Sequence, residues 1–461
     1  MKISKLFLTS LMISALTFVS CTDEEENNNN SGSSVIKLSG NLETMTLTND
    51  KQYLIEGQTF VRSGKVLTIQ PGTIIKGDKA TKGTLVIDKG GRIEANGTAS
   101  QPIVMTSNLP AGSRDRGDWG GLVILGNAPV NQTDPSIEGI TPAVVFGGTV
   151  SNDNSGTLRY VRVEYAGIEL TPNNETNSIT LGAVGSGTTM ENVQVTYGGD
   201  DGFEWFGGTV NGKYLISFAC WDDSFDVDFG YTGKNQFGLE VRYPSFADQS
   251  GSNSFECDNG PNDNVTTLLT EGVFSNFTCI GPKATDAQSI NANYQHSIDL
   301  RRRTAVTIAN SIFIGYNNGL RMNQQSVYTN YVPLTGTPVG KLLNNILVIP
   351  AARDFVVGTG MTATTADIRT WFNLTNTLIT TATADAFGTL GLATNVAFGS
   401  NVVSAYPANP NFAVTTGTLT SGAAFTDAKL SGLQSVAYRG AFGTTDWTDG
   451  WAEFLPNSRA Y

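Results

Sequence analysis

Histidine is almost absent from the sequence, because His296 is the only one among 461 residues. Ser-His-Asp triads, Cys-His pairs and zinc sites built from several histidines are therefore excluded. A basic surface is lacking as well, since 41 acidic residues outnumber 29 basic ones and leave a net charge of −12. Phosphate recognition needs positive charge, so we expect no nucleic-acid partner.

Cysteine is scarce, with four in the chain. Cys220, Cys257 and Cys279 lie in the body of the sequence. An odd number of cysteines does not make a disulfide framework in an oxidising compartment. We expect all three to be small, buried, apolar residues. Cys21 stands apart from them, close to the N-terminus.

Long apolar runs are also lacking, apart from one over residues 6–19. That run follows two lysines, is too short to span a bilayer and suits a secretory signal. It ends in Ser20 and Cys21, which resembles a lipobox, although the two residues before Ser20 depart from the usual pattern. The sequence therefore predicts a lipoprotein signal peptide over residues 1–20 and a lipid on Cys21 that anchors the chain in the outer membrane. Ordinary cleavage that leaves a free cysteine is the alternative.

A polar run follows Cys21: Asp23-Glu24-Glu25-Glu26, four asparagines and Ser31-Gly32-Ser33-Ser34. Such residues cannot bury apolar area, so residues 21–35 should form a flexible, solvated tether. The acidic run also resembles the surface-export signal of some Gram-negative lipoproteins, which implies that the body faces the cell exterior. A plain solvated spacer is the alternative.

Glycine is abundant, with 51 residues, and only 15% of the chain is charged. This composition is typical of many short strands joined by tight turns. Five segments share one pattern, in which a small residue precedes apolar, charged, apolar and mostly polar positions, at spacings of 22, 30, 43 and 22 residues. A strand with one buried side gives this alternation. The segments are Gly202–Phe206, Ser224–Asp228, Ser254–Asp258, Ser297–Arg301 and Gly319–Asn323.

The repeated register favours a solenoid, whose stacked coils bury a face that no single coil can bury. An antiparallel β-sandwich with fortuitous self-similarity is the alternative. We predict an all-β chain, with a single right-handed parallel β-helix over residues 36–404 and a C-terminal closing region over residues 405–461. The last coil of a solenoid exposes its core and a sheet edge, so this region should cap it. The aromatic residues expected to cover the open end are Phe442, Trp447, Trp451 and Phe454.

Three stretches carry a more specific likeness: Gly198–Gly208, Cys220–Gly230 and Arg439–Gly443 with the later Trp451. They resemble a family of exported bacterial proteins, many of them lipoproteins, that have a right-handed parallel β-helix similar to that of pectate lyases. The resemblance covers the chain beyond the tether. It implies the fold and a location in the cell envelope, and it brings no activity or assigned site with it.

The polar positions of the five segments should face outward in columns. Neighbouring coils lie about 4.8 Å apart and alternate residues of a strand about 6.6 Å apart, so four carboxylates would form a compact rectangle. Calcium accepts carboxylate oxygens in flexible geometry, and we predict a calcium site there. Pairing of the acids with Arg301, Arg302 and Arg321 is the alternative. The predicted metal ligands are Asp226, Asp228, Glu256 and Asp258.

Two catalytic interpretations also stay open. A calcium-dependent polysaccharide lyase would need a base, for which Arg301 or Arg302 is the candidate, although arginine is protonated at ordinary pH. A glycoside hydrolase would use paired acids, Asp226 with Asp258 or Asp228 with Glu256. The diagonals of the rectangle lie near the separation of about 6.5–9.5 Å that inverting enzymes need.

The lack of a convincing catalytic set favours a non-enzymatic binding or accessory protein. Its partner would be a polysaccharide, a protein or an outer-membrane complex, and a structural surface-layer component is a further alternative. An aromatic side chain beside polar groups suits sugar or protein binding. The residues expected to bind the ligand are Asp201, Glu204, Trp221, Asp222, Asp223, Asp299 and Arg321.

Overall fold

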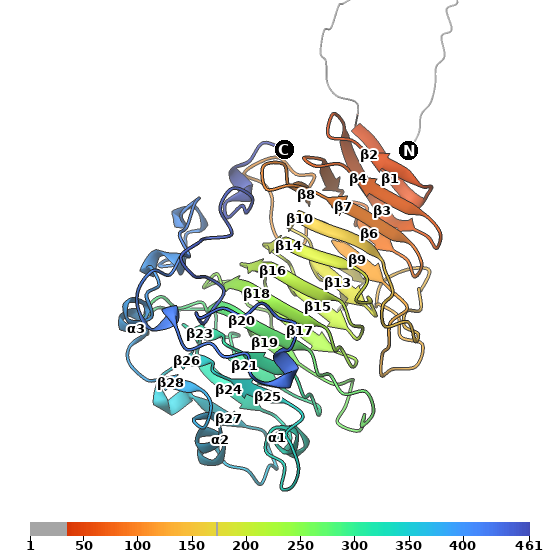
Figure 1. Ribbon diagram of the computed structural model, residues 1–461. Coiled ribbons are helices and arrows are strands. Elements are labelled where there is room, and N and C mark those ends of the chain that lie inside the picture. The colour runs from red at the N-terminus through yellow and green to blue at the C-terminus, as the bar shows by residue number, and fades with distance from the viewer. Residues whose placement is uncertain (1–34, 172–173) are drawn as a thin grey trace, which may run out of the picture. The chain divides into compact units, whose positions relative to one another are not determined.

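The structure is a computed structural model that describes residues 35–171 and 174–461. The predicted signal peptide, Cys21 and the predicted tether up to residue 34 lie outside the described residues. From Val35 onward, short strands follow one another along a stack of coils, as Figure 1 shows. No helix in the described part of the chain is long and apolar enough to cross a membrane.

Each coil contributes to three parallel sheets, here called face 1, face 2 and face 3. Longer strands bend at a corner and belong to two faces. Of these, β1 (Val35–Leu42) and β3 (Gln52–Val61) join faces 1 and 2, while β10 (Gly156–Glu164), β14 (Thr189–Thr196), β16 (Asn211–Phe218), β18 (Lys234–Val241) and β20 (Val273–Ile280) join faces 3 and 1.

The shorter strands each belong to one face. Face 1 contains β5 (Ile74–Gly77), β8 (Ile103–Ser107), β23 (Ile312–Ile314), β26 (Ile346–Val348) and β28 (Thr377–Ile379). Face 2 contains β6 (Thr84–Ile87), β9 (Leu122–Leu125), β13 (Ile179–Gly182), β15 (Phe203–Phe206), β17 (Phe225–Asp228), β19 (Phe255–Cys257), β21 (His296–Leu300), β24 (Asn318–Met322) and β27 (Phe355–Val357). Face 3 contains β2 (Met45–Leu47), β4 (Val66–Ile69), β7 (Arg92–Asn96), β22 (Thr307–Ala309) and β25 (Lys341–Leu343).

All of these pairings are parallel, which confirms the predicted parallel β-helix. The small hairpin of β11 (Glu169–Thr171) and β12 (Asn174–Glu175) is antiparallel and lies outside the coils' sheets. The sequence dictates the coil because apolar residues alternate inward. Phe203, Phe225 and Phe255 occupy one register position on face 2 and are fully buried. Cys220, Cys257 and Cys279 are buried and free, as predicted.

The corner between faces 3 and 1 repeats an unusual backbone conformation. Asn192, Tyr214, Phe237, Asn276 and Asn310 have φ between 53° and 64°, a left-handed region that most side chains avoid. At each of these positions the chain turns from one sheet into the next and directs a side chain outward. The rings of Tyr214 and Phe237 stack at 5.3 Å. This row of side chains forms a surface on which other parts of the chain can pack.

The open end of the core is closed by helices. Val327 and Tyr331 of α1 (Gln325–Tyr331) and Ile368 and Phe372 of α2 (Thr365–Phe372) join the main apolar core. A third helix, α3 (Thr383–Leu390), packs on the outer side of face 1. Short 3₁₀ turns are η1 (Ala351–Arg353), η2 (Thr394–Val396), η3 (Val403–Ala405), η4 (Thr418–Thr420), η5 (Ala428–Leu430) and η6 (Pro456–Ser458).

The prediction that the C-terminal aromatic residues cover this open end is wrong. Residues 405–461 instead run back along the side of the stack, and they are called the C-terminal strap below (Figure 1). The ring centres of Phe454 and Phe218 of β16 lie 5.1 Å apart, and those of Trp451 and Tyr160 of β10 lie 5.8 Å apart. The outer side of face 1 is apolar, so these rings stabilise the fold by covering a sheet that water would otherwise contact.

Candidate functional site

The predicted outward column of charges on face 2 is confirmed by the strand register. Glu204 of β15 lies opposite Asp226 of β17, which lies opposite Glu256 of β19. The column continues through Asp299 of β21 to Arg321 of β24. The parallel pairing therefore places in one row five residues that are spread over more than one hundred positions of the sequence.

Arginines neutralise the C-terminal half of this column. Arg301 donates to both carboxylate oxygens of Asp258, at 3.0 and 2.6 Å, and contacts Glu256 at 2.5 Å. Arg302 adds a third bond to Asp258 at 2.6 Å. Asp299 is fully buried and is bound by both arms of the Arg321 guanidinium. Pairing with arginine, one of the two predicted ways to offset the acids, holds for this half.

The predicted rectangle of four carboxylates is only partly assembled. Asp258 is held by the guanidiniums, and Asp228 accepts bonds from the backbone N–H groups of Phe229 and Gly260. Asp226 and Glu256 do come together, but with Asp223 of the preceding turn. The acidic residues that share contacts therefore lie further toward the N-terminal coils than the sequence pattern indicated.

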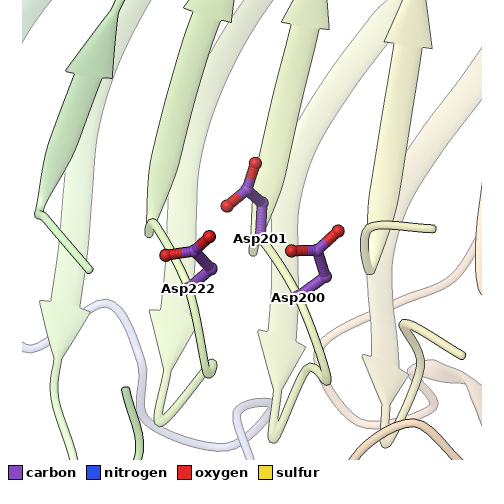
Figure 2. Close-up of side chains that lie close together, drawn as sticks. All are labelled: Asp200, Asp201 and Asp222. Carbon is purple, nitrogen blue, oxygen red and sulfur yellow. The ribbon is translucent and has the colours of Figure 1, made fainter. Parts of the chain in front are cut away.

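The grouped acids are called the carboxylate cluster. It consists of three overlapping triads in which one carboxylate oxygen of each residue lies within 4.8 Å of the others. Figure 2 shows one triad, at the turns that lead into neighbouring strands of face 2. The triads are Asp200–Asp201–Asp222, Asp201–Glu204–Asp226 and Asp223–Asp226–Glu256.

Positive charge does not balance the carboxylate cluster. Among the described residues, Glu256 is the only one of the seven acids that forms an ion pair. Neutral donors satisfy part of the rest: Asn177 donates to Glu204, and the Asp223 N–H donates to Asp201 at 2.8 Å. One oxygen of Asp222 and one of Asp226 are buried and receive no hydrogen bond from the described part of the chain.

The acids in this cluster resist ionisation. Burial raises the pKa of Asp222 to about 6, and burial together with the nearby acids Asp258, Asp299 and Asp222 raises that of Glu256 to about 8 despite Arg301. Burial, followed by repulsion from neighbouring carboxylates, also raises the pKa values of Asp200, Asp201, Glu204, Asp223 and Asp226 well above their usual range. A bound cation would remove both costs.

The donor set fits calcium. Two carboxylate oxygens up to 4.8 Å apart can both reach one ion at Ca–O distances of about 2.3–2.6 Å. Calcium takes six to eight oxygen ligands in variable geometry, which a crowded, irregular set of acids from several coils can supply. One oxygen each of Asp222 and Asp226 receives no hydrogen bond from the described part of the chain, so it is free to bind an ion. When bound, the ion would supply charge compensation and open coordination positions for hydroxyl or carboxylate oxygens of a ligand.

A cavity of about 280 Å³ lies at the edge of the cluster, lined by Asp200, Trp221 and Arg116 among others. The Arg116 guanidinium lies 3.3 Å from the centre of the Trp221 ring, and the indole N–H has no hydrogen-bond partner in the described residues. Glu175 and Asp248 add negative charge to the wall. The predicted ligand residue Trp221 thus lies beside the predicted acid Asp222, at a concave surface.

The turn that carries Trp221 and Asp222 is held by a buried ion pair. Arg242 donates to the backbone carbonyl of Trp221 at 3.1 Å and to the Ser224 hydroxyl at 3.0 Å, while Glu240 accepts from the same hydroxyl at 2.8 Å. Both charged side chains are fully buried. Sequence reasoning missed this pair, although opposite charges at Glu240 near the end of β18 and at Arg242 just after it were a visible signal.

Other site residues were not within reach of sequence reasoning. Arg116 comes from a loop some hundred residues before Trp221, and no local pattern marks it. Asp200 and Asp248 lie in turns and loops, and Glu175 lies in the small antiparallel hairpin outside the coils, where the repeated strand pattern predicts nothing. His296 begins β21 and is buried, and burial lowers the pKa of its imidazole to about 3. It is therefore neutral over the ordinary pH range.

The two arginines predicted as the base of a lyase are both held by acids. Asp258 and Glu256 raise the pKa of the Arg301 guanidinium further above its usual range, so it stays protonated. Arg302 is held by the same carboxylate, Asp258. Abstraction of a proton by either arginine would break a partly buried ion pair, which opposes the reaction.

Comparison with known proteins agrees with this architecture. The family model described as a pectate-lyase-like β-helix domain matches residues 40–386. The chain belongs to this β-helix family. Neither the curated proteins nor the solved structures contain a match to it. Membership of the β-helix family accounts for the coils of faces 1 to 3.

Proposed function

We propose that this protein is a non-enzymatic binding protein of the bacterial envelope that holds calcium in the carboxylate cluster and binds a glycan beside it. The observation that carries this proposal is the imbalance of charge: seven grouped carboxylates share one guanidinium, and two buried oxygens have no donor. Structural acids normally have hydrogen-bonded or ion-paired partners when they are buried.

Glycan recognition follows from the surroundings of the cluster. The cavity beside Asp200 offers one partly exposed aromatic side chain, one guanidinium and several carboxylates. Sugars present hydroxyl groups that calcium and carboxylates bind, and C–H faces that pack on aromatic rings. A saccharide with free vicinal hydroxyls therefore suits both the ion and the Trp221 cavity.

The location of this activity rests on the N-terminal segment. A lipid on Cys21 would anchor the β-helix to the outer membrane, and the acidic run after it would direct the body to the exterior. There the partner would be an environmental or cell-wall polysaccharide, or an outer-membrane protein that works with this chain. Incorporation of radiolabelled palmitate into the wild type and its loss in Cys21→Ser test the anchor.

Binding is favoured over catalysis because the basic groups next to the cluster are guanidiniums bound by acids. The test is a panel of neutral and acidic oligosaccharides, measured by calorimetry in calcium and in EGTA, with product analysis of each mixture. We expect calcium-dependent binding of one class without cleavage. Asp226→Asn should abolish it, whereas Asp134→Asn, which removes an equal charge at an exposed site, should not. Unsaturated products would show that the protein is a lyase, and hydrolysed products would show that it is a hydrolase; either result would contradict the proposed binding function.

A further inference from the structure

A second concave surface lies on a different side of the β-helix from the carboxylate cluster. It is a groove of about 690 Å³ between the outer side of face 3 and the C-terminal strap. Strands β14, β16 and β18 form its floor, and residues 431–434 of the strap form the opposite wall. A short segment near the C-terminus, residues 431–434, therefore forms one wall of the groove, and strands from the middle of the chain form its floor.

The strap is fixed on this floor by specific hydrogen bonds. The Gln236 side chain donates to the Gln434 carbonyl at 2.7 Å and accepts from the Gln434 N–H at 2.8 Å. This two-way contact orders the wall without using the lysines of the groove. The groove is therefore a built feature of the fold, since both walls are tied to each other at its edge.

Two lysines in the groove carry uncompensated charge. Lys213 of β16 donates to the Gln434 side-chain oxygen at 2.9 Å, and Lys234 of β18 donates to the Ser431 carbonyl at 2.6 Å. Both acceptors are neutral, and within the described residues neither lysine lies within 4.0 Å of a carboxylate oxygen. The acid of the groove, Glu191, is already paired with Arg159 at 3.0 Å.

Each ammonium group also has donors to spare. A lysine carries three N–H donors, and the hydrogen bonds within the described chain use one on each side chain. Two cations with free donors in one groove are unusual on a chain whose net charge is −12. An anion in the groove would gain charge-assisted hydrogen bonds from these donors.

Apolar atoms line the same groove. Leu433 of the strap wall is only partly buried, so an occupant meets C–H groups as well as charge. Thr189 and Asn211 add hydroxyl and amide groups that can bond to alcohols. A bare phosphate or chloride ion would use only the lysines, whereas a sugar that carries an acidic group would use all three kinds of surface.

We propose that the groove between face 3 and the C-terminal strap is a second ligand site, which takes a carboxylate- or sulfate-bearing saccharide through Lys213 and Lys234. The acidic group accepts hydrogen bonds from the ammonium groups, and the ring packs against the apolar atoms of Leu433. This site does not depend on calcium or on the carboxylate cluster, so it stands or falls separately from the function proposed above.

The experiment measures binding of an oligogalacturonate, a sulfated dextran oligosaccharide and neutral dextran by calorimetry in EGTA, at low and high salt. We expect the acidic saccharides to bind without calcium, neutral dextran to fail, and added salt to weaken the binding. Binding of the carboxylated sugar alone or of the sulfated sugar alone supports the site and identifies the acidic group. Failure of both acidic sugars in EGTA at low salt overturns it, whatever calcium does to the other site.

Two variants separate the site from general charge effects. Lys213→Gln with Lys234→Gln should weaken acidic-sugar binding by about tenfold or more for each lost charge-assisted bond. The control Lys51→Gln with Lys89→Gln removes the same charge far from the groove and should leave the affinity unchanged. Equal loss in the control double variant would overturn the proposal.

A third variant tests whether a loss of binding could come from a loosened strap and not from the loss of the lysine charge. Gln434→Glu keeps a side chain of the same length against Lys213 and places an internal carboxylate where the ligand acid would sit. It should raise or preserve the melting temperature and still lose most of the acidic-sugar affinity. Undiminished binding by Gln434→Glu would contradict the assignment of Lys213.

Discussion

Arg301 donates two hydrogen bonds to the carboxylate of Asp258, one coil before it in the β-helix. This contact divides the acidic column of face 2 into two halves with different properties. On one side the acids are neutralised by guanidiniums. On the other, Asp226 and the acids N-terminal to it in the cluster remain crowded and without positive partners among the described residues. The proposed calcium site lies on that second side.

Replacement of Arg301 tests the neutralised half. Arg301→Gln leaves Glu256 without its guanidinium and Asp258 with Arg302 alone, and both acids are largely buried. We expect a loss of about 3 kcal/mol in the free energy of unfolding, measured by denaturant titration without calcium. Arg92→Gln breaks a more exposed pair with Glu94 and should cost about 1 kcal/mol or less. Equal costs for the two variants would contradict the division of the column.

The pH dependence of the metal-free protein should have an unusual sign. Folding raises the pKa of Asp222 to about 6 and that of Glu256 to about 8, from about 4 in the unfolded chain. Between about pH 4 and pH 8 the folded protein therefore binds more protons than the unfolded one, so its stability falls as pH rises. Melting temperatures in EGTA should be higher at pH 5 than at pH 8.

Calcium should reverse this trend, because the ion binds the ionised acids and stabilises the folded state at pH 8. The difference between the melting curves with and without calcium should be large at pH 8 and small at pH 5. A melting temperature in EGTA that rises from pH 5 to pH 8 would contradict the crowding of ionisable acids in the cluster.

The buried Arg242 is expected to position the Trp221 turn. Arg242→Met leaves Glu240 charged and unpaired in the interior, so we expect a loss of about 3–5 kcal/mol. The double variant Arg242→Met with Glu240→Gln removes the unpaired charge and should recover part of that stability. Its ligand affinity should stay below that of the wild type, because the carbonyl of Trp221 keeps only the Ser252 hydroxyl of its two donors. Full recovery of ligand affinity in the double variant would show that Arg242 serves the fold alone.

The corner residue Asn310 should hold the C-terminal strap. Its amide accepts from the N–H of Ala424 at 3.0 Å and donates to the Ala424 carbonyl at 3.1 Å, while its own φ is 53°. Asn310→Gly loses the side-chain hydrogen bonds, but glycine adopts the left-handed backbone conformation without strain. Asn310→Ala loses the same hydrogen bonds and is also strained in that conformation. Both should destabilise the fold, Ala by about 1 kcal/mol more than Gly, as measured by denaturant titration. An Ala variant as stable as the Gly variant would show that the left-handed corner carries no cost.

The coils could be predicted from the sequence because register repeats leave a direct trace in it. Phe203, Phe225 and Phe255 recur in one pattern since each must enter the same core position. The path of the strap could not be predicted in this way. An aromatic residue such as Trp451 indicates that its side chain is buried, but not which surface buries it. Both the open end of the core and the apolar outer side of face 1 could have taken it, and the structure shows the second.

The candidate site was predicted in part for the same reason. The strand positions Glu204, Asp226 and Glu256 followed from periodicity. Arg116, Asp200 and the pair Glu240–Arg242 did not, because turns and loops have no period and a buried ion pair depends on contacts between coils. The carboxylate cluster therefore lies partly in the turns before the strands for which the sequence predicted metal ligands.

Calorimetric titration of the metal-free protein with calcium at pH 7.5 tests the central claim most directly. The account predicts saturable binding that is lost in Asp226→Asn and retained in Asp134→Asn, because Asp226 belongs to two of the three carboxylate triads. Magnesium should bind more weakly, since the irregular cluster does not offer octahedral geometry. No heat of binding to the wild type, or equal binding to the Asp226→Asn variant, would contradict the proposal that this face of the β-helix holds a cation.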